Sequence, residues 1–202
     1  MGKAESNKQL KRESLLNTAY KLFTTKGIHD TSISDIVKEA GVAKGTFYLY
    51  FKDKYDINNK LVYHRSTKLF ENAVDKLMAS DKANAPVKDK LIFIIDCVID
   101  ALADNKSLLM FISKNLGLGF YRYAMETAHN EDDSIIRKID EEVLNEIDSS
   151  VTNPELMMYM IIELTGSSIF SSILYEKPVS IEELKPHLYT TILNIVDQFT
   201  IK

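Results

Sequence analysis

The sequence contains few of the residues typical of disulfide-stabilised or β-rich proteins. It has a single cysteine, Cys97, no tryptophan, and only seven glycines and four prolines among 202 residues. One cysteine excludes an internal disulfide and a zinc site built from several cysteines. So few glycines and prolines, beside abundant Leu, Ile, Lys and Glu, favour an all-α protein over a β-rich one. The absence of tryptophan decides nothing.

Signatures of catalysis are also missing. The four histidines are scattered without the spacing of metal ligands: His29, His64, His129 and His187. There is no H-E-x-x-H, no phosphate-binding loop, no dinucleotide-binding glycine pattern and no G-x-S-x-G. The carboxylates of residues 131–133 and 140–146 are most simply a solvated helical face. We therefore expect a protein that is not an enzyme and that has no cofactor and no metal site.

Long apolar runs are absent as well. The longest one is far short of a membrane span, and no signal peptide precedes the first helical pattern. We expect a cytoplasmic protein without a membrane partner. With 202 residues, of which 45% are hydrophobic, the chain can bury a full core in one or two domains.

Charge is distributed unevenly along the chain. The net charge is −4, which by itself argues against binding nucleic acid. Residues 1–60, however, hold eleven Lys and Arg against seven Asp and Glu, a net charge of +4, which leaves −8 for residues 61–202. A basic head on an acidic body favours one defined DNA-binding face over general adhesion to polyanions.

Residues 31–54, TSISDIVKEAGVAKGTFYLYFKDK, contain two short helical patterns around a glycine. Ser32 or Ser34 can cap the first helix, whose apolar residues follow at helical spacing. Gly41 ends it, because a tight turn between helices usually needs a positive φ angle. Phe47 and Phe51, four residues apart, give the second helix one buried face.

The second helix therefore turns polar groups away from the core. These outward residues are Lys44, Gly45, Thr46, Tyr48 and, with a packing role as an equal alternative, Tyr50. A short helix that offers a cation, a hydroxyl, a phenol and a glycine for close approach suits a DNA major groove. For each lysine the alternative is an ordinary solvated charge.

The run TSISDIVKEAGVAKGTFYLYFKDK, preceded by a helical segment ending in LFTTKG, resembles the DNA-binding domain of the TetR family of transcriptional regulators. The resemblance covers about residues 8–60 and implies that Lys44, Gly45 and Thr46 open the recognition helix. It also implies DNA contacts, mostly with phosphates, for Tyr48, Tyr50 and Lys54. The full set of DNA-binding candidates is Ser34, Lys44, Gly45, Thr46, Tyr48, Tyr50, Lys52 and Lys54.

Two residues depart from the family's pattern. Val37 stands where an alanine is usual, at the crossing of the first two helices of the domain. Ala43 stands where a serine or threonine usually caps the recognition helix, which removes a cap worth about 1 kcal/mol.

The remaining chain reads as long helices. We expect about nine in all, with a helix-turn-helix DNA-binding domain of three helices over residues 1–53 and a helical effector-binding and dimerisation domain over residues 54–202. Asp53 is placed to cap a helix running to about residue 79, and Pro86 suits the first turn of the next one. Asn153 and Pro154 mark a clear helix start, and Pro186 either starts or kinks the last helix.

Two sites are predicted in the second domain. The resemblance implies a homodimer in which the last two helices pair with their copies, through Gly166, Ile169, Phe170, Ile173, Leu188, Ile192, Ile195 and Phe199. The alternative is that these helices complete the core of one chain. An apolar effector pocket would draw on Phe93, Met110, Ser113, Phe120, Tyr121, Met125, His129, Met157 and Met160, although core packing is the commoner role of such side chains.

The resulting hypothesis is a homodimeric regulator that binds a double-stranded DNA operator in a sequence-specific way. In its leading form the protein is a repressor that a small hydrophobic effector releases from DNA. The alternative is a regulator or architectural factor controlled by a protein partner, without a small-molecule effector.

Overall fold

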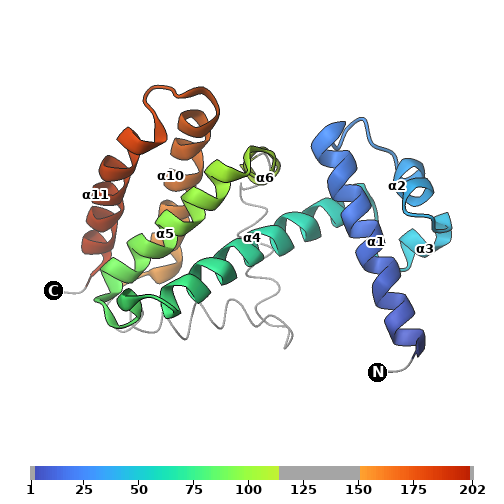
Figure 1. The fold of residues 1–202 in the computed structure, drawn as a ribbon, viewed down its shortest axis with the longest axis horizontal. Coiled ribbons are helices and arrows are strands. Elements are labelled where there is room, and N and C mark those ends of the chain that lie inside the picture. The colour runs from blue at the N-terminus through green and yellow to red at the C-terminus, as the bar shows by residue number, and fades with distance from the viewer. Residues whose placement is uncertain (1–2, 114–150, 201–202) are drawn as a thin grey trace. The chain divides into compact units, whose positions relative to one another are not determined.

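The computed structural model describes residues 3–113 and 151–200 of the chain. The chain divides into two compact units, Met1–His64 and Arg65–Lys202. We call the described residues of the first unit the head and those of the second unit the body. The described residues form eight α-helices, one 3₁₀ helix and no strand, apart from an isolated bridge between Val151 and Thr200. The prediction of an all-α fold is thereby confirmed (Figure 1).

The head consists of α1 (Lys3–Thr25), α2 (Ile33–Glu39), α3 (Lys44–Tyr48) and the beginning of α4 (Lys54–Met78). α4 continues into the body without a break at residues 64 and 65, where the two units divide. The predicted domain boundary at residues 53 and 54 is the start of α4. Residues 1–53 as a separate DNA-binding domain therefore stay a prediction.

Local sequence sets the ends of the head helices. Gly27 and Gly41 have φ angles of +88° and +68°, and each follows a helix that it ends. Of the two predicted caps for α2, Ser32 is the one used. Its hydroxyl accepts the N–H of Asp35 at 3.1 Å, while the Asp35 carboxylate accepts the N–H of Ser32 at 2.9 Å. This hydrogen bonding to Ser32 lowers the pKa of Asp35.

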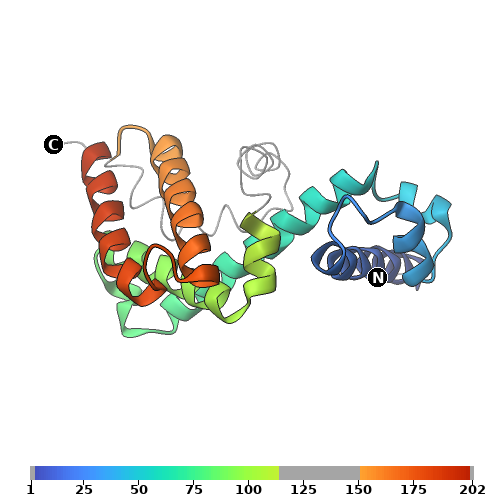
Figure 2. The same ribbon diagram turned by 90° about the horizontal axis from the view of Figure 1, so that it is seen from above.

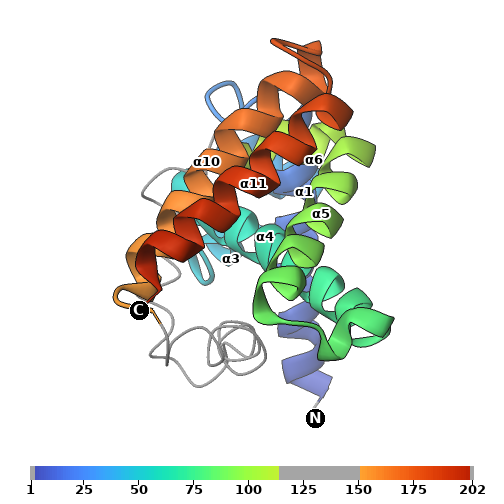
Figure 3. The same cartoon turned by 90° about the vertical axis from the view of Figure 1, so that its left-hand side faces the viewer.

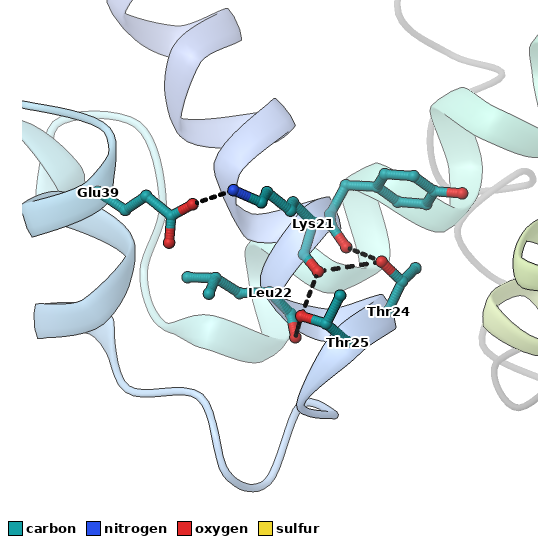
Figure 4. A network of polar contacts seen from close by, with 6 residues as sticks. Lys21, Leu22, Thr24, Thr25 and Glu39 are labelled. Carbon is teal, nitrogen blue, oxygen red and sulfur yellow. Dashed lines mark hydrogen bonds and ion pairs between the residues drawn. The ribbon is translucent and has the colours of Figure 1, made fainter.

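The head core gathers apolar side chains from all four helices. Its fully buried members include Leu15, Ala19, Ile36, Phe47, Phe51, Ile57 and Leu61. The ion pair between Lys21 of α1 and Glu39 of α2, 2.8 Å long, joins these two helices at the surface (Figure 4). In the same view the hydroxyls of Thr24 and Thr25 donate to carbonyls one turn earlier in α1.

The body contains the rest of α4, a 3₁₀ helix η1 (Asp81–Asn84), α5 (Val87–Asp104), α6 (Lys106–Ser113), α10 (Pro154–Tyr175) and α11 (Ile181–Phe199). α10 and α11 run side by side, as Figures 2 and 3 show, and α10 also packs against α6. Asn153 caps α10 and Pro154 occupies its first turn, as predicted. Pro186 lies inside α11, which begins earlier, at Ile181.

α10 carries the most apolar stretch of the body. Leu156–Tyr175 has a mean hydropathy of 1.4 and is the one segment of the described residues that is long and apolar enough to cross a membrane. The prediction that no apolar run approaches a membrane span was wrong in this respect. A core helix passes the same test of length and composition, and α10 packs against two helices of the body.

A polar cluster joins α5 to α11. The Lys185 ammonium of α11 donates to Asp96 and Asp100 of α5, and the Tyr189 hydroxyl donates to Asp96. Burial opposes the charge on Asp96, but the bonds from Lys185 and Tyr189 outweigh it and lower its pKa. Burial also opposes the charge on Lys185, whose pKa is nevertheless raised by the bonds to Asp100 and Asp96.

Replacing Lys185 by methionine is expected to destabilise the body by about 1 kcal/mol, since solvent screens this half-exposed cluster. The loss of stability should be greatest at pH values at which Asp96 is ionised and Lys185 is protonated. It should shrink as the pH falls below the ordinary pKa of Asp96, 3.8, and as it rises above that of Lys185, 10.5. Urea denaturation across this pH range measures the effect. The exposed Lys106 of α6, replaced in the same way, serves as the control, and an equal loss there would refute the role of the cluster.

Candidate nucleic-acid interface

The short helix α3 presents one face to the head core and the other to solvent. Phe47 is fully buried and Phe51 is 2% exposed, and their ring centroids lie 5.5 Å apart. The N–H groups of Tyr50 and Phe51 both donate to the Phe47 carbonyl at 3.0 Å, so the chain stays helical beyond Tyr48. The position of the two phenylalanines therefore decides which side chains of α3 face outward.

The structure separates the predicted DNA-binding residues into two groups. The exposed ones are Ser34, Lys44, Gly45, Tyr48 and Lys52, and the half-buried ones are Thr46, Tyr50 and Lys54. The exposed group leaves its side chains open to a ligand such as DNA. All eight assignments remain predictions. Two of these residues, Tyr50 and Lys54, form hydrogen bonds within the head.

Tyr50 and Lys54 already bond to the head itself. The Tyr50 hydroxyl donates to the Lys8 carbonyl of α1 at 3.1 Å. The Lys54 ammonium donates to the carbonyls of Ile28, His29 and Thr31 at 2.8, 3.0 and 3.2 Å. An ammonium has three N–H donors, so a phosphate oxygen would have to replace one of these carbonyls.

Lys60, which the sequence did not single out, also forms hydrogen bonds within the head. Lys60 donates to the Tyr50 carbonyl at 3.3 Å and to Asp56 at 3.4 Å, and it lies 5.3 Å from the ring centroid of Phe51. The spacing of Asp56 and Lys60, four residues apart on one helix, was the signal in the sequence. Lys54 thus bonds the start of α4 to the loop before α2, and Lys60 bonds it to the turn after α3.

The carboxylates of the head are largely engaged, whereas its outward lysines are not. Asp35 belongs to the capping box of α2, and Asp53 accepts the first N–H groups of α4 at 2.8 Å. Asp56 accepts the N–H of Lys52 at 2.9 Å. By contrast, the ammonium groups of Lys44 and Lys52 have no ion-pair partner among the described residues. This side of the head is therefore suited to a phosphate backbone.

The recognition helix lacks a side-chain cap. Ala43 is the N-cap residue of α3 and makes no capping bond, as the sequence predicts. Replacing Ala43 by threonine should stabilise the head by about 0.5–1 kcal/mol, because its hydroxyl can accept an N–H of the first turn. Valine has the same shape without an acceptor and should give no gain. Thermal unfolding of the two variants measures this, and equal stabilities would contradict it.

The predicted effector residues are only partly placed. Phe93 of α5 and Ser113 of α6 are half-buried, while Met110 and Met160 are exposed and Met157 is fully buried in α10. The structure therefore spreads these five over different environments. Phe120, Tyr121, Met125 and His129 lie outside the described residues.

The predicted dimer interface is mostly inside one chain. Five of its members are buried within the body: Ile169, Ile173, Leu188, Ile192 and Phe199. These five side chains lie in the core of one chain, and the pairing of α10 and α11 with a second subunit stays a prediction. Gly166, Phe170 and Ile195 remain half-buried and keep surface for a second subunit.

The comparisons with known proteins agree with this geometry. The family model described as "Bacterial regulatory proteins, tetR family" matches residues 15–60, from α1 to the start of α4. The fatty acid metabolism regulator protein of Bacillus subtilis is 33% identical over 101 residues, half of this chain and half of that relative's length. The HTH-type transcriptional regulator YvdT of the same organism is 27% identical over 186 residues, 89% of this chain and 92% of its own.

Solved structures share the fold over nearly the whole chain. A TetR-family transcriptional regulator from Streptomyces coelicolor has a TM-score of 0.67 at 12% identity, covering 94% of this chain and 99% of its own. The regulator FadR of Bacillus subtilis, in complex with stearoyl-CoA, has a TM-score of 0.60 at 21% identity, covering 90% and 97%.

Fold and site together define a helix-turn-helix DNA-binding protein with a helical body. The chain belongs to the TetR family of bacterial transcriptional regulators. It is accordingly a regulator of transcription and not an enzyme.

Proposed function

We propose that this regulator is a homodimeric repressor that an apolar effector releases from its operator. The proposed contact with the operator rests on the outward face of α3, where Lys44 and Tyr48 are exposed while Phe47 is buried in the head core. The effector part is supported by the relative named as a fatty acid metabolism regulator and by the similar fold bound to stearoyl-CoA. Its place of action would be the cytoplasm, where bacterial DNA lies.

A second copy of the chain would cover the apolar helix α10. In the segment Leu156–Tyr175, which has a mean hydropathy of 1.4, 28% is fully buried and most of the remainder is half-buried. Apolar surface that one chain covers only in part is typical of subunit contacts. Gly166 and Phe170 of α10 and Ile195 of α11 are the predicted interface residues that remain accessible for this purpose.

Buried hydroxyls in the body support an effector site. The side-chain oxygens of Ser66, Thr165 and Ser172 are buried and meet no hydrogen-bond partner within the described residues. A buried hydroxyl without a partner costs about 1–3 kcal/mol. Thr165 and Ser172 lie seven residues apart on α10 and hence on the same face of that helix. The carbonyl of an acyl thioester would offer such a hydroxyl an acceptor.

Release from DNA then requires that the effector prefer one arrangement of the dimer. A ligand shifts an equilibrium only by its difference in affinity between the two states. Two recognition helices must lie about 34 Å apart to enter successive major grooves. We infer that the effector binds more tightly to a dimer in which α4 holds the two heads at another spacing.

The first test is fluorescence anisotropy with DNA that flanks the protein's own gene and scrambled DNA as competitor. We expect specific binding by a dimer and release by stearoyl-CoA at micromolar concentration. Free CoA and stearate, added separately, distinguish the thioester from its parts. Retained binding with every acyl-CoA chain length, in a dimer that is otherwise intact, would refute this effector.

A pair of variants separates the effector site from folding. Replacing Thr165 by valine, or Ser172 by alanine, removes an unsatisfied hydroxyl and should leave the stability equal or higher. The same variants should need several times more stearoyl-CoA for release. Unchanged release by both variants would exclude these hydroxyls from the effector site.

The second candidate is control by a protein partner, with the body serving only association. Its supporting observation is the partly covered apolar surface of α10, where Leu156, Met160 and Tyr175 are exposed and a different protein could bind as well. A dimer that ignores acyl-CoA but is displaced from DNA by a second protein would favour this candidate. Equal binding to flanking and scrambled DNA would favour an architectural role.

A further inference from the structure

Leu49 is an apolar side chain that the fold of the head leaves in solvent. It is 78% exposed, the highest value for any large apolar side chain of the described residues. Its backbone angles, φ −72° and ψ −22°, are helical, and its N–H donates to the Thr46 carbonyl at 3.3 Å. Leu49 therefore continues α3 as a helical residue.

Helical geometry puts Leu49 opposite the core. With 3.6 residues per turn, it lies about 160° around the helix axis from both Phe47 and Phe51. Gly45, one turn earlier, shares this outermost position, and a Cβ added to Gly45 would meet nothing within 4 Å. The middle of the outward face of α3 is thus formed by a glycine and a leucine, without a polar group.

Charged groups lie beside this apolar centre. Lys44, at the start of α3, and Lys52, just beyond it, are both exposed and have no ion-pair partner in the described part of the chain. Contacts from such lysines to phosphates position a recognition helix but carry no sequence information. The base sequence of the DNA must be read by groups that lie between Lys44 and Lys52, and Leu49 is one of these groups.

The apolar group that a base edge presents in the major groove is the C5-methyl of thymine. We propose that Leu49 contacts a thymine methyl in each operator half-site and is a specificity-determining residue of α3. This inference rests on DNA binding by the helix-turn-helix alone. It does not depend on the proposed effector or on repression.

Deoxyuridine provides the test, because it keeps the hydrogen-bonding edge of thymidine and lacks only the methyl group. An operator is first selected from random DNA with the full-length protein, and each thymine is then replaced singly. One replacement per half-site should weaken binding about fourfold, the effect of one buried methyl group. The Leu49→Ala variant should bind the thymine operator more weakly and show no preference for thymine over uracil there.

Two controls keep the outcome unambiguous. Circular dichroism of Leu49→Ala should match the parent, since so exposed a side chain contributes little to the core. The variant Met78→Ala changes another exposed apolar residue, outside α3, and should keep the full preference for thymine. The proposal is overturned if no replacement by uracil weakens binding, or if Leu49→Ala discriminates thymine from uracil as well as the parent does.

Discussion

Replacing Lys54 by methionine is expected to weaken operator binding at least tenfold. Methionine keeps most of the length of the side chain and removes all three N–H donors, so the carbonyls of Ile28, His29 and Thr31 lose their common partner. Hydrogen bonds to charged groups contribute about 1.5–3 kcal/mol each, less where water replaces them. The loop between α1 and α2 would then lose its attachment to the start of α4.

That loop leads directly into the helix-turn-helix. Thr31, whose carbonyl Lys54 holds, is buried, and its hydroxyl donates to the Gly27 carbonyl at 2.8 Å. The next residue, Ser32, is the cap of α2. A loosened loop would therefore shift α2, and the position of α3 would change with it. We expect Lys54 to act on DNA mainly by positioning these helices.

The dependence of affinity on salt distinguishes positioning from phosphate contact. Loss of one phosphate contact lowers the slope of log K against log salt by about 1, whereas loss of a positioning residue leaves the slope unchanged. We expect an unchanged slope for Lys54→Met and a lower slope for Lys44→Met, the matched control on the outward face. A slope lowered by about 1 in Lys54→Met would show a direct phosphate contact instead.

The variant Phe47→Ala should have the largest effect on stability. Phe47 is fully buried between its neighbours and has edge and tilted ring contacts with Tyr48 and Phe51. Removing a buried phenylalanine costs about 3–5 kcal/mol through lost burial and the cavity that remains. Since whole domains are stable by only about 5–15 kcal/mol, most of the head's stability would be lost. Operator binding should be abolished at 37 °C.

Urea denaturation, followed by circular dichroism alongside DNA binding, measures this effect. The variant Phe47→Leu should lose much less, because leucine fills most of the space. A matched change on the other face of α3, Leu49→Ala, should leave stability nearly unchanged while weakening binding. If Phe47→Ala unfolded at the same urea concentration as the parent, the assignment of Phe47 to the head core would be wrong.

Several features of the fold could be read directly from the sequence. Gly41 and the pair Asn153 and Pro154 mark helix ends by properties of the residues themselves, and the structure has helix ends at these positions. Phe47 and Phe51 are buried because four residues make about one helical turn, which needs no knowledge of the partner. The family of the chain followed from the same short stretch of residues.

Other assignments needed the fold. Ser32 and Ser34 were equal candidates for the cap of α2, and only the backbone conformation selected Ser32. Lys54 resembled a residue that contacts DNA, but its ammonium reaches carbonyls more than twenty residues earlier in the chain. The family resemblance likewise assigned Leu188 and Ile192 to a subunit contact, although both are buried in their own chain. The spacing of apolar residues indicates that one face of a helix is buried, but it does not indicate whether the same chain or a second subunit covers that face.

The sequence by itself determined the all-α class, the ends of several helices, the basic head and the DNA-binding family. These depend on local propensities, on glycine and proline geometry and on spacing within single helices. Only the tertiary structure decided which polar groups are already bonded and which apolar side chains the protomer itself covers. Hydrogen bonds such as those of Lys54 and Lys185 join residues distant in sequence, and the exposure of Leu49 depends on how α3 packs on the head.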